Sequence, residues 1–287
     1  MQVALLVNLS RWPRRLVRSI WHVFLALCTE EHCRICRRGI DQLGLIQSRF
    51  NAPSATLTGR FCSDQKSFAV CRDCWQLFDL QEQMLTRYAL SPSGLREMST
   101  GLDSESDLLR EDERLLVVAS GIGYIEPMKK LIRRYKYDQD RLLTSELAML
   151  LLNGWGCIAP FVELDKTVFV PVPLHWRRKR ERGYNQAALV AQRAASALKV
   201  RVRESGLRRC KATTPQNKLS KEAREENLAG AFKGNRKVLQ GKDVVFIDDV
   251  CTSGYTLAEC AKTAYDCGAR SVYGLTIARA ILVHKRQ

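Results

Sequence analysis

The chain has 287 residues, of which 46% are hydrophobic, and its 46 lysines and arginines outnumber its 30 aspartates and glutamates to give a formal net charge of +16. This length suits one large domain or two modest ones, and it excludes a disordered chain, a collagen-like repeat and a small disulfide scaffold. The positive charge lies mainly in residues 1–40, 175–182 and 199–242. Such concentration indicates a phosphate-bearing partner, or alternatively a solvated basic surface.

Residues 1–28 predict a basic amphipathic extension. Four arginines precede an apolar stretch over 20–27, which is shorter than the roughly 18–20 residues that cross a bilayer. Leu27 before Cys28 suits neither a signal-peptidase site nor a lipidated cysteine. We therefore expect a cytoplasmic chain, with peripheral membrane contact through residues 1–28 as the alternative.

Among the eleven cysteines, two Cys-x-x-Cys pairs stand out. A turn of this kind directs two thiolates at one ion, and two such turns complete a four-sulfur zinc site. The sequence therefore predicts a structural zinc ion in a small module over 29–90, held by Cys33, Cys36, Cys71 and Cys74. The 34 residues that separate the pairs exceed the usual gap of about 15 to 20, so Cys28, His32 and Cys62 stay open as substitute ligands.

Residues 91–114 predict a linker between two domains. They begin with Ser-Pro-Ser-Gly and continue into a run of aspartates and glutamates. Turn-forming residues and dense charge with little apolar periodicity are typical of a connecting segment.

Beyond the linker, the pattern alternates between strands and helices. Apolar or β-branched runs predict strands over 115–120, 167–172, 243–247 and 271–277, and apolar periodicity predicts helices that begin near Met128 and span 186–198 and 256–267. This alternation favours parallel βαβ units. We expect an α/β domain over 115–287, in which helices cover both faces of a parallel sheet and ligands bind at the carboxyl ends of its strands.

The stretch between the strand over 243–247 and the helix over 256–267 is the most informative. Two adjacent acids, Asp248 and Asp249, follow the strand, and hydroxyl residues with one glycine come before the helix. Hydroxyls and backbone N–H groups at a helix start bind phosphate, and paired carboxylates can accept the hydroxyls of a sugar. The combination suits a ribose 5-phosphate, and acids that only cap the next helix are the alternative.

This stretch resembles the phosphoribosyl pyrophosphate (PRPP) motif of type I phosphoribosyltransferases, and other segments narrow the resemblance to ComF-type competence proteins. They are Pro-Val-Pro-Leu-His at 171–175 with Arg-Gly-Tyr-Asn-Gln at 182–186, a block over 215–232, the helix that begins near Met128, and the cysteine pairs. The resemblance implies a type I phosphoribosyltransferase-like α/β fold, a zinc finger before it, and PRPP with Mg²⁺ as ligands. Residues 1–28 and the insertion over 37–70 depart from the family.

By the same resemblance, Asp248 and Asp249 would contact the ribose hydroxyls of PRPP. Displacement of pyrophosphate needs cations and N–H donors on the leaving group more than a general base, so Arg182 joins the acids as a catalytic candidate. The other PRPP-binding candidates are Gly183, Tyr184, Val250, Cys251, Thr252, Ser253, Gly254, Tyr255 and Thr256.

The resemblance further implies a role in the uptake of single-stranded DNA during natural transformation, with the DNA-uptake machinery as partner. Exposed aromatics beside cations bind single strands, which makes Trp176, Arg177, Arg178 and Arg180 candidates and Tyr184 a second stacking platform; Trp176 packed under the sheet is the alternative. Two other hypotheses stay open: a metabolic nucleobase or amine phosphoribosyltransferase without a DNA role, and a non-catalytic DNA-binding factor on the same scaffold. The sequence predicts neither the phosphoribosyl acceptor nor the oligomeric state.

Overall fold

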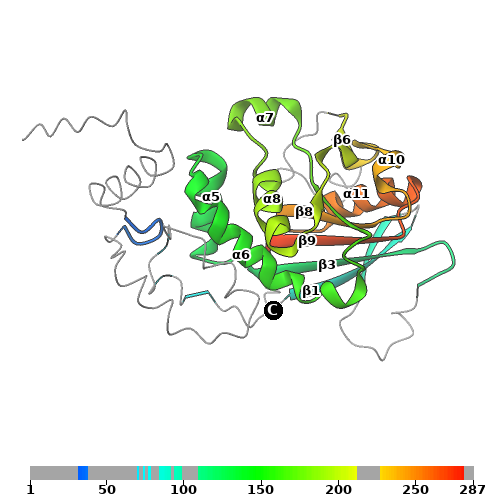
Figure 1. The fold of residues 1–287 in the computed structure, drawn as a ribbon, viewed down its shortest axis with the longest axis horizontal. Coiled ribbons are helices and arrows are strands. Elements are labelled where there is room, and N and C mark those ends of the chain that lie inside the picture. Colours follow the sequence, from blue (N-terminus) through cyan, green and yellow to red (C-terminus); the bar gives the residue numbers. More distant parts are fainter. Residues whose placement is uncertain are drawn as a thin grey trace, which may run out of the picture.

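The computed structural model describes residues 32–37, 70, 74, 77–78, 84–91, 94–98, 109–211 and 227–280 (Figure 1). Within them, seven strands form one sheet in the order β2-β1-β3-β9-β8-β4-β5, and β6 pairs with β7 separately. The strands are β1 (Met84–Ser91), β2 (Gly94–Met98), β3 (Arg114–Gly123), β4 (Thr167–Pro171), β5 (Arg201–Val202), β6 (Leu207–Arg209), β7 (Phe232–Gly234), β8 (Asp243–Cys251) and β9 (Ser271–Arg279). The α-helices are α5 (Met128–Tyr137), α6 (Thr144–Trp155), α7 (Trp176–Arg182), α8 (Gln186–Leu198), α10 (Arg236–Leu239) and α11 (Tyr255–Asp266).

The sheet confirms the predicted α/β fold. Strands β3, β9, β8, β4 and β5 pair in parallel. Side chains of β8 alternate between two cores: Val245 and Ile247 pack with α5, α6 and α8, whereas Val244 and Phe246 pack with α11. Because successive residues of a strand face opposite sides, helices cover both faces of the sheet.

Helix α5 is the amphipathic helix that the sequence predicts. Its four buried residues, Met128, Leu131, Ile132 and Tyr135, lie at the expected spacing. The helix over Gln186–Leu198 is also confirmed, with the Asn185 side chain accepting from the N–H of Ala187 as its N-cap.

The sequence analysis missed α6, which lies directly on β3. Residues 147–151 are all buried, so the helix is apolar on every side and shows no period. Two glycines permit the close approach: a Cβ on Gly154 would lie 2.9 Å from the carbonyl carbon of Ser120, and a Cβ on Gly121 would overlap the carbonyl oxygen of Leu150.

The expected linker over 91–114 does not match the described structure, because β2 lies within it and belongs to the main sheet. β1 pairs antiparallel with both β2 and β3, which makes the sheet mixed instead of purely parallel. β1 also falls in the segment that we assigned to the cysteine module. Tyr88, Leu90 and Met98 are buried, and this burial outweighs the turn-forming composition of the surrounding sequence.

The strand predicted over 243–247 runs on to Cys251. Its parallel pairing with β9 continues from Asp248 opposite Thr276 to Cys251 opposite Arg279. The two acids therefore sit on the strand itself. Among the described residues, no helix is both long and apolar enough to span a membrane.

Candidate functional site

The carboxyl ends of β4 and β8 meet around a cavity of about 840 Å³. Its walls come from α5, the segment between β4 and α8, β6, the end of β8 and the start of α11. They include the charged residues Lys136, Arg178, Glu181, Arg182, Arg209, Asp248 and Asp249. Of the predicted stretch over 248–256, every residue except Ser253 lines the cavity, so the fold brings the acids, the loop and several cations together.

The acid pair, Asp248 and Asp249, lies where β8 reaches this cavity. Lys136 Nζ of α5 is 2.7 Å from Asp249 Oδ1, and the N–H of Asp249 donates to Asp248 Oδ1 at 2.8 Å. Burial, and then the charge of Asp249, raise the pKa of Asp248 from 3.8 to about 7 against the opposing effect of Lys136. Thus one carboxylate is paired with a cation, and the other changes charge near neutral pH.

The 252–256 loop leads from β8 into α11, a helix of 12 residues. Gly254 precedes the helix with a φ of +79°, and a Cβ there would lie 2.8 Å from the Tyr88 ring, so glycine is required. The Ser253 hydroxyl is buried and has no hydrogen-bond partner among the described residues. Ser253 does not line the cavity, whereas Thr252 and Thr256 do, and hydroxyls beside a helix N-terminus are suited to bind an anion.

A network of side chains from β1, β2 and β9 contacts the start of this loop. Arg279 of β9 donates to Tyr88 Oη at 2.9 Å and to Glu97 Oε1 at 2.8 Å, and its Nη1 lies 3.6 Å from Cys251 Sγ. Burial raises the pKa of Tyr88, which keeps its phenol neutral. Sequence analysis missed these residues because the contacts join positions 191 and 182 residues apart.

The segment between β4 and α8 holds the predicted pyrophosphate contacts. Arg182 lines the cavity and donates to Gln186 Oε1 at 3.4 Å. Gln186 also lines it, and its Nε2 is buried without a partner in the described part of the chain. Gly183 and Tyr184 do not line the cavity; the Tyr184 hydroxyl donates to the carbonyl of Tyr135 at 2.8 Å. Gln186 is therefore better placed for a ligand than those two candidates.

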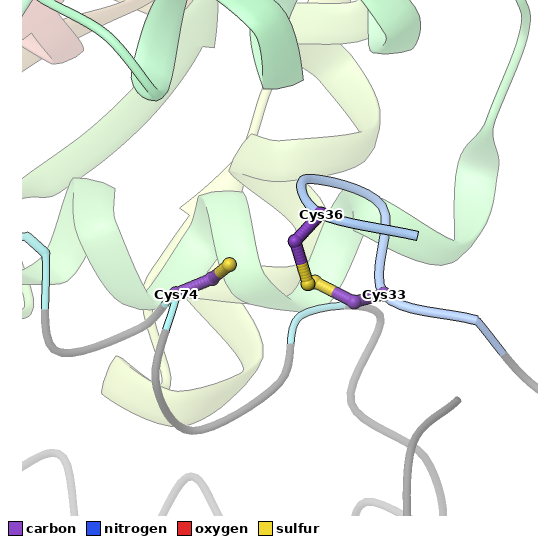
Figure 2. Close-up of side chains that lie close together, drawn as sticks. All are labelled: Cys33, Cys36 and Cys74. Carbon is purple, nitrogen blue, oxygen red and sulfur yellow. The ribbon is translucent and has the colours of Figure 1, made fainter. Parts of the chain in front are cut away.

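Cys33, Cys36 and Cys74 lie together, with their sulfur atoms within 4.8 Å of one another and turned toward a common centre (Figure 2). The N–H of Ile35 donates to Cys33 Sγ at 3.4 Å, a contact that stabilises a thiolate. Zinc–sulfur bonds of ~2.3 Å place tetrahedral ligands about 3.8 Å apart, so these sulfurs fit one metal ion. Cys71, the predicted fourth ligand, and the extension over 1–28 lie outside the described residues.

No protein-family model matches the chain. The DNA utilization protein YhgH of Escherichia coli O6:H1 is 33% identical over 176 residues, which cover 59% of this chain and 73% of that protein. Competence protein F of Haemophilus influenzae is 32% identical over 160 residues, or 55% and 70% of the two chains. The chain belongs to the ComF family. Competence protein ComFC of Bacillus subtilis is 26% identical over 269 residues, 90% of this chain and 88% of that protein.

A solved structure of glutamine PRPP amidotransferase from B. subtilis shares 16% identity over 65% of this chain and 34% of its own, with a TM-score of 0.29. A score this low carries no argument. The α/β fold of this ComF-family chain follows from its own strand order and parallel pairing.

Helix α7 of this ComF-family chain carries an aromatic ring among cations. Figure 1 shows that the helix lies apart from the sheet. Trp176 is 57% exposed, and the Arg177 and Arg180 guanidinium carbons lie 5.3 and 5.4 Å from its ring centroid. The alternative that Trp176 packs under the sheet is therefore wrong. Arg178 lines the cavity instead, and the buried ring of Tyr184 is unsuited to stack on a DNA base.

The described residues of the basic stretch over 199–242 contribute to two separate hollows. A second hollow, of about 570 Å³, lies beside β5 and the amino ends of β4 and β8; its charged lining residues are Lys199, Arg201, Arg203, Lys237, Lys242 and the single acid Asp165. Arg209 of β6 reaches the first cavity, where burial and then Arg178 lower its pKa. The stretch therefore contributes cations both to the cavity and to a separate basic surface.

Proposed function

We propose that this ComF-family chain binds PRPP with Mg²⁺ in the cavity at the carboxyl ends of β4 and β8, and acts in the uptake and use of DNA. The observation that carries the proposal is the acid pair directly before a cavity-lining loop that combines a required Gly254 with a helix N-terminus. The acid pair and the 252–256 loop are neighbours, and a ribose can place its hydroxyls on the acids and its 5-phosphate on the loop.

Each part of PRPP would meet a complementary wall. The 5-phosphate would accept hydrogen bonds from the N–H groups of the 252–256 loop and from the hydroxyl of Thr252, which lines the cavity, while the ribose hydroxyls would donate to Asp249 and Asp248. The pyrophosphate would face Arg182 and the unpaired Nε2 of Gln186. Since negative charge develops on the leaving pyrophosphate, these donors would lower the barrier to transfer by electrostatic stabilisation, and the acceptor would need no strong general base.

Two metals belong to the proposal. Mg²⁺ arrives with PRPP as part of the substrate and neutralises its phosphates. Zinc would be held by Cys33, Cys36 and Cys74, with Cys71 as the fourth ligand, in a closed four-sulfur shell that has a structural role.

A DNA-binding role is supported by a separate surface. The relatives are named for DNA utilization and for competence, and α7 offers the exposed Trp176 ring between Arg177 and Arg180. Stacking of a base on an aromatic ring contributes ~1–3 kcal/mol, and the neighbouring arginines attract the backbone. We infer that α7 binds single-stranded DNA close to the PRPP cavity, which Arg178 and Arg182 of the same helix line.

A pyrophosphate-release assay tests the proposal. PRPP, Mg²⁺ and a panel of nucleobases or amines are supplied with and without single-stranded DNA. Release that single-stranded DNA alters supports the combined role. Release with one base and no affinity for DNA would instead favour a metabolic phosphoribosyltransferase, and DNA binding without affinity for PRPP would favour a non-catalytic factor.

A further inference from the structure

Helix α5 contacts both the cavity and the cysteine cluster. On the cavity side, Lys136 Nζ lies 2.7 Å from Asp249 Oδ1. On the cysteine side, Lys130 Nζ donates to the carbonyl of Ile35 at 2.6 Å and Arg134 Nη1 donates to the carbonyl of Arg34 at 3.0 Å. A single helix of 10 residues therefore joins the cysteine turn (residues 32–37) to the acid pair.

Asp140, just after α5, also joins the cysteine turn to the helix. Its Oδ2 lies 2.9 Å from Arg34 Nε in an ion pair and accepts a hydrogen bond from Arg134 Nη2 at 3.4 Å. The side chains of Asp140 and Arg134 are only 10% and 14% exposed, so these ion pairs are shielded from solvent and stronger than exposed ones. Cys33 and Ile35 also share one apolar core with the buried residues of α5.

Helical geometry separates the two contacts. Lys130 and Arg134 are four residues apart and lie on one face, whereas Lys136 is two residues beyond Arg134 and points to another side. Because a hydrogen-bonded helix of 10 residues moves as one unit, a shift of α5 at Lys130 and Arg134 also shifts Lys136. No substrate-contacting role is needed for Lys130 or Arg134, because neither lines the cavity.

We propose that Lys136 is a PRPP-site residue that orients Asp249 for the ribose hydroxyls, and that the cysteine turn positions Lys136 by fixing α5 through Lys130 and Arg134. This inference rests on the proposed PRPP function. Lys130 and Arg134 are positioning residues.

The first test is a set of PRPP titrations by calorimetry in excess Mg²⁺. Lys136→Met should weaken PRPP binding about 10-fold, and Lys130→Met and Arg134→Gln should each weaken it about three- to fivefold, as expected for charged contacts in one network. In the Lys136→Met background, the other two substitutions should have no further effect. Arg133→Gln, an exposed arginine of the same helix, is the matched control and should bind like the wild type.

The second test separates positioning from mere stability. The charges of Asp249, Lys136 and Arg209 all affect the pKa of Asp248. PRPP affinity should rise as Asp248 ionises near pH 7. Loss of Lys136 should move that midpoint upward, and Arg134→Gln should move it in the same direction by less. Should Arg134→Gln not fold, Lys130→Met gives the same comparison, because it leaves both Asp140 ion pairs in place.

The outcomes test the positioning role of α5 separately from the proposed binding of PRPP. Wild type that does not bind PRPP contradicts the proposed function itself. Wild type that binds PRPP, with Lys130→Met and Arg134→Gln less thermally stable but unchanged in PRPP affinity and pH midpoint, overturns the positioning role alone. Losses that add fully to that of Lys136→Met overturn it as well.

Discussion

Asp248→Asn should make the free protein more stable while it weakens PRPP binding. Burial and the charge of Asp249 raise the pKa of Asp248 from 3.8 to about 7, so the folded state holds a proton that the unfolded state has released. For an acid whose pKa is raised by folding, the stability of the fold falls as pH rises from about 4 to about 7 and is then constant. Asparagine does not ionise, and its Oδ1 can still accept from the N–H of Asp249.

The magnitude follows from the displacement of the pKa. Each pH unit corresponds to ~1.4 kcal/mol, so the full displacement corresponds to about 4 kcal/mol above pH 7. Because the cavity is open to water, we expect about half of this, ~2 kcal/mol, or ~4–8 °C in Tm for a domain of this size.

Thermal unfolding at pH 5 and pH 8.5 measures the effect. Asp248→Asn should be more stable than the wild type mainly at pH 8.5, and its affinity for PRPP should fall at least about 10-fold because an acceptor for the ribose hydroxyls is lost. Asp112→Asn, which changes an exposed aspartate before β3, is the control and should change neither the stability nor the affinity for PRPP. A variant that is equally stable, or less stable, than the wild type at both pH values would refute the reasoning.

Further predictions concern the loop, the DNA surface and the metal. Gly254→Ala should abolish the PRPP-induced rise in Tm and lower stability by ~1–3 kcal/mol in chemical denaturation, since its Cβ would meet the Tyr88 ring at 2.8 Å; an unaltered PRPP response would contradict the loop assignment. Trp176→Ala with Arg177→Gln and Arg180→Gln should weaken binding of single-stranded DNA and flatten its salt dependence in fluorescence anisotropy, and unchanged binding would exclude α7. Metal analysis should give one zinc per chain, and Cys74→Ser should lower that ratio; zinc retained in full would exclude the cysteine site.

Local patterns in the sequence predicted those parts of the fold that local forces determine. The spacing of Met128, Leu131, Ile132 and Tyr135 specifies α5 because a helix buries one stripe. The apolar run before Asp248 and the glycine before α11 specify a strand, a tight turn and a helix start. Each of these features lies within about a dozen residues of sequence.

The remaining features depend on contacts that no short window contains. The partner of Asp249 is Lys136, 113 residues earlier. Helix α6 is apolar all round and carries no period, and its close approach to β3 depends on Gly121 in the strand and Gly154 in the helix. β1 and β2 form a hairpin whose burial against β3 is decided by tertiary packing, and Tyr88 in β1 then supports the loop at Gly254.

The most direct test of the central claim is the calorimetric titration of the wild-type chain and of Asp248→Ala/Asp249→Ala with PRPP in the presence of Mg²⁺. The wild type should show saturable binding of one PRPP per chain, and the double variant, with its fold verified by circular dichroism, should show none. Wild type that shows no binding, or a double variant that binds with the same affinity, would contradict the assignment of the β8 acid pair and the 252–256 loop as a PRPP site.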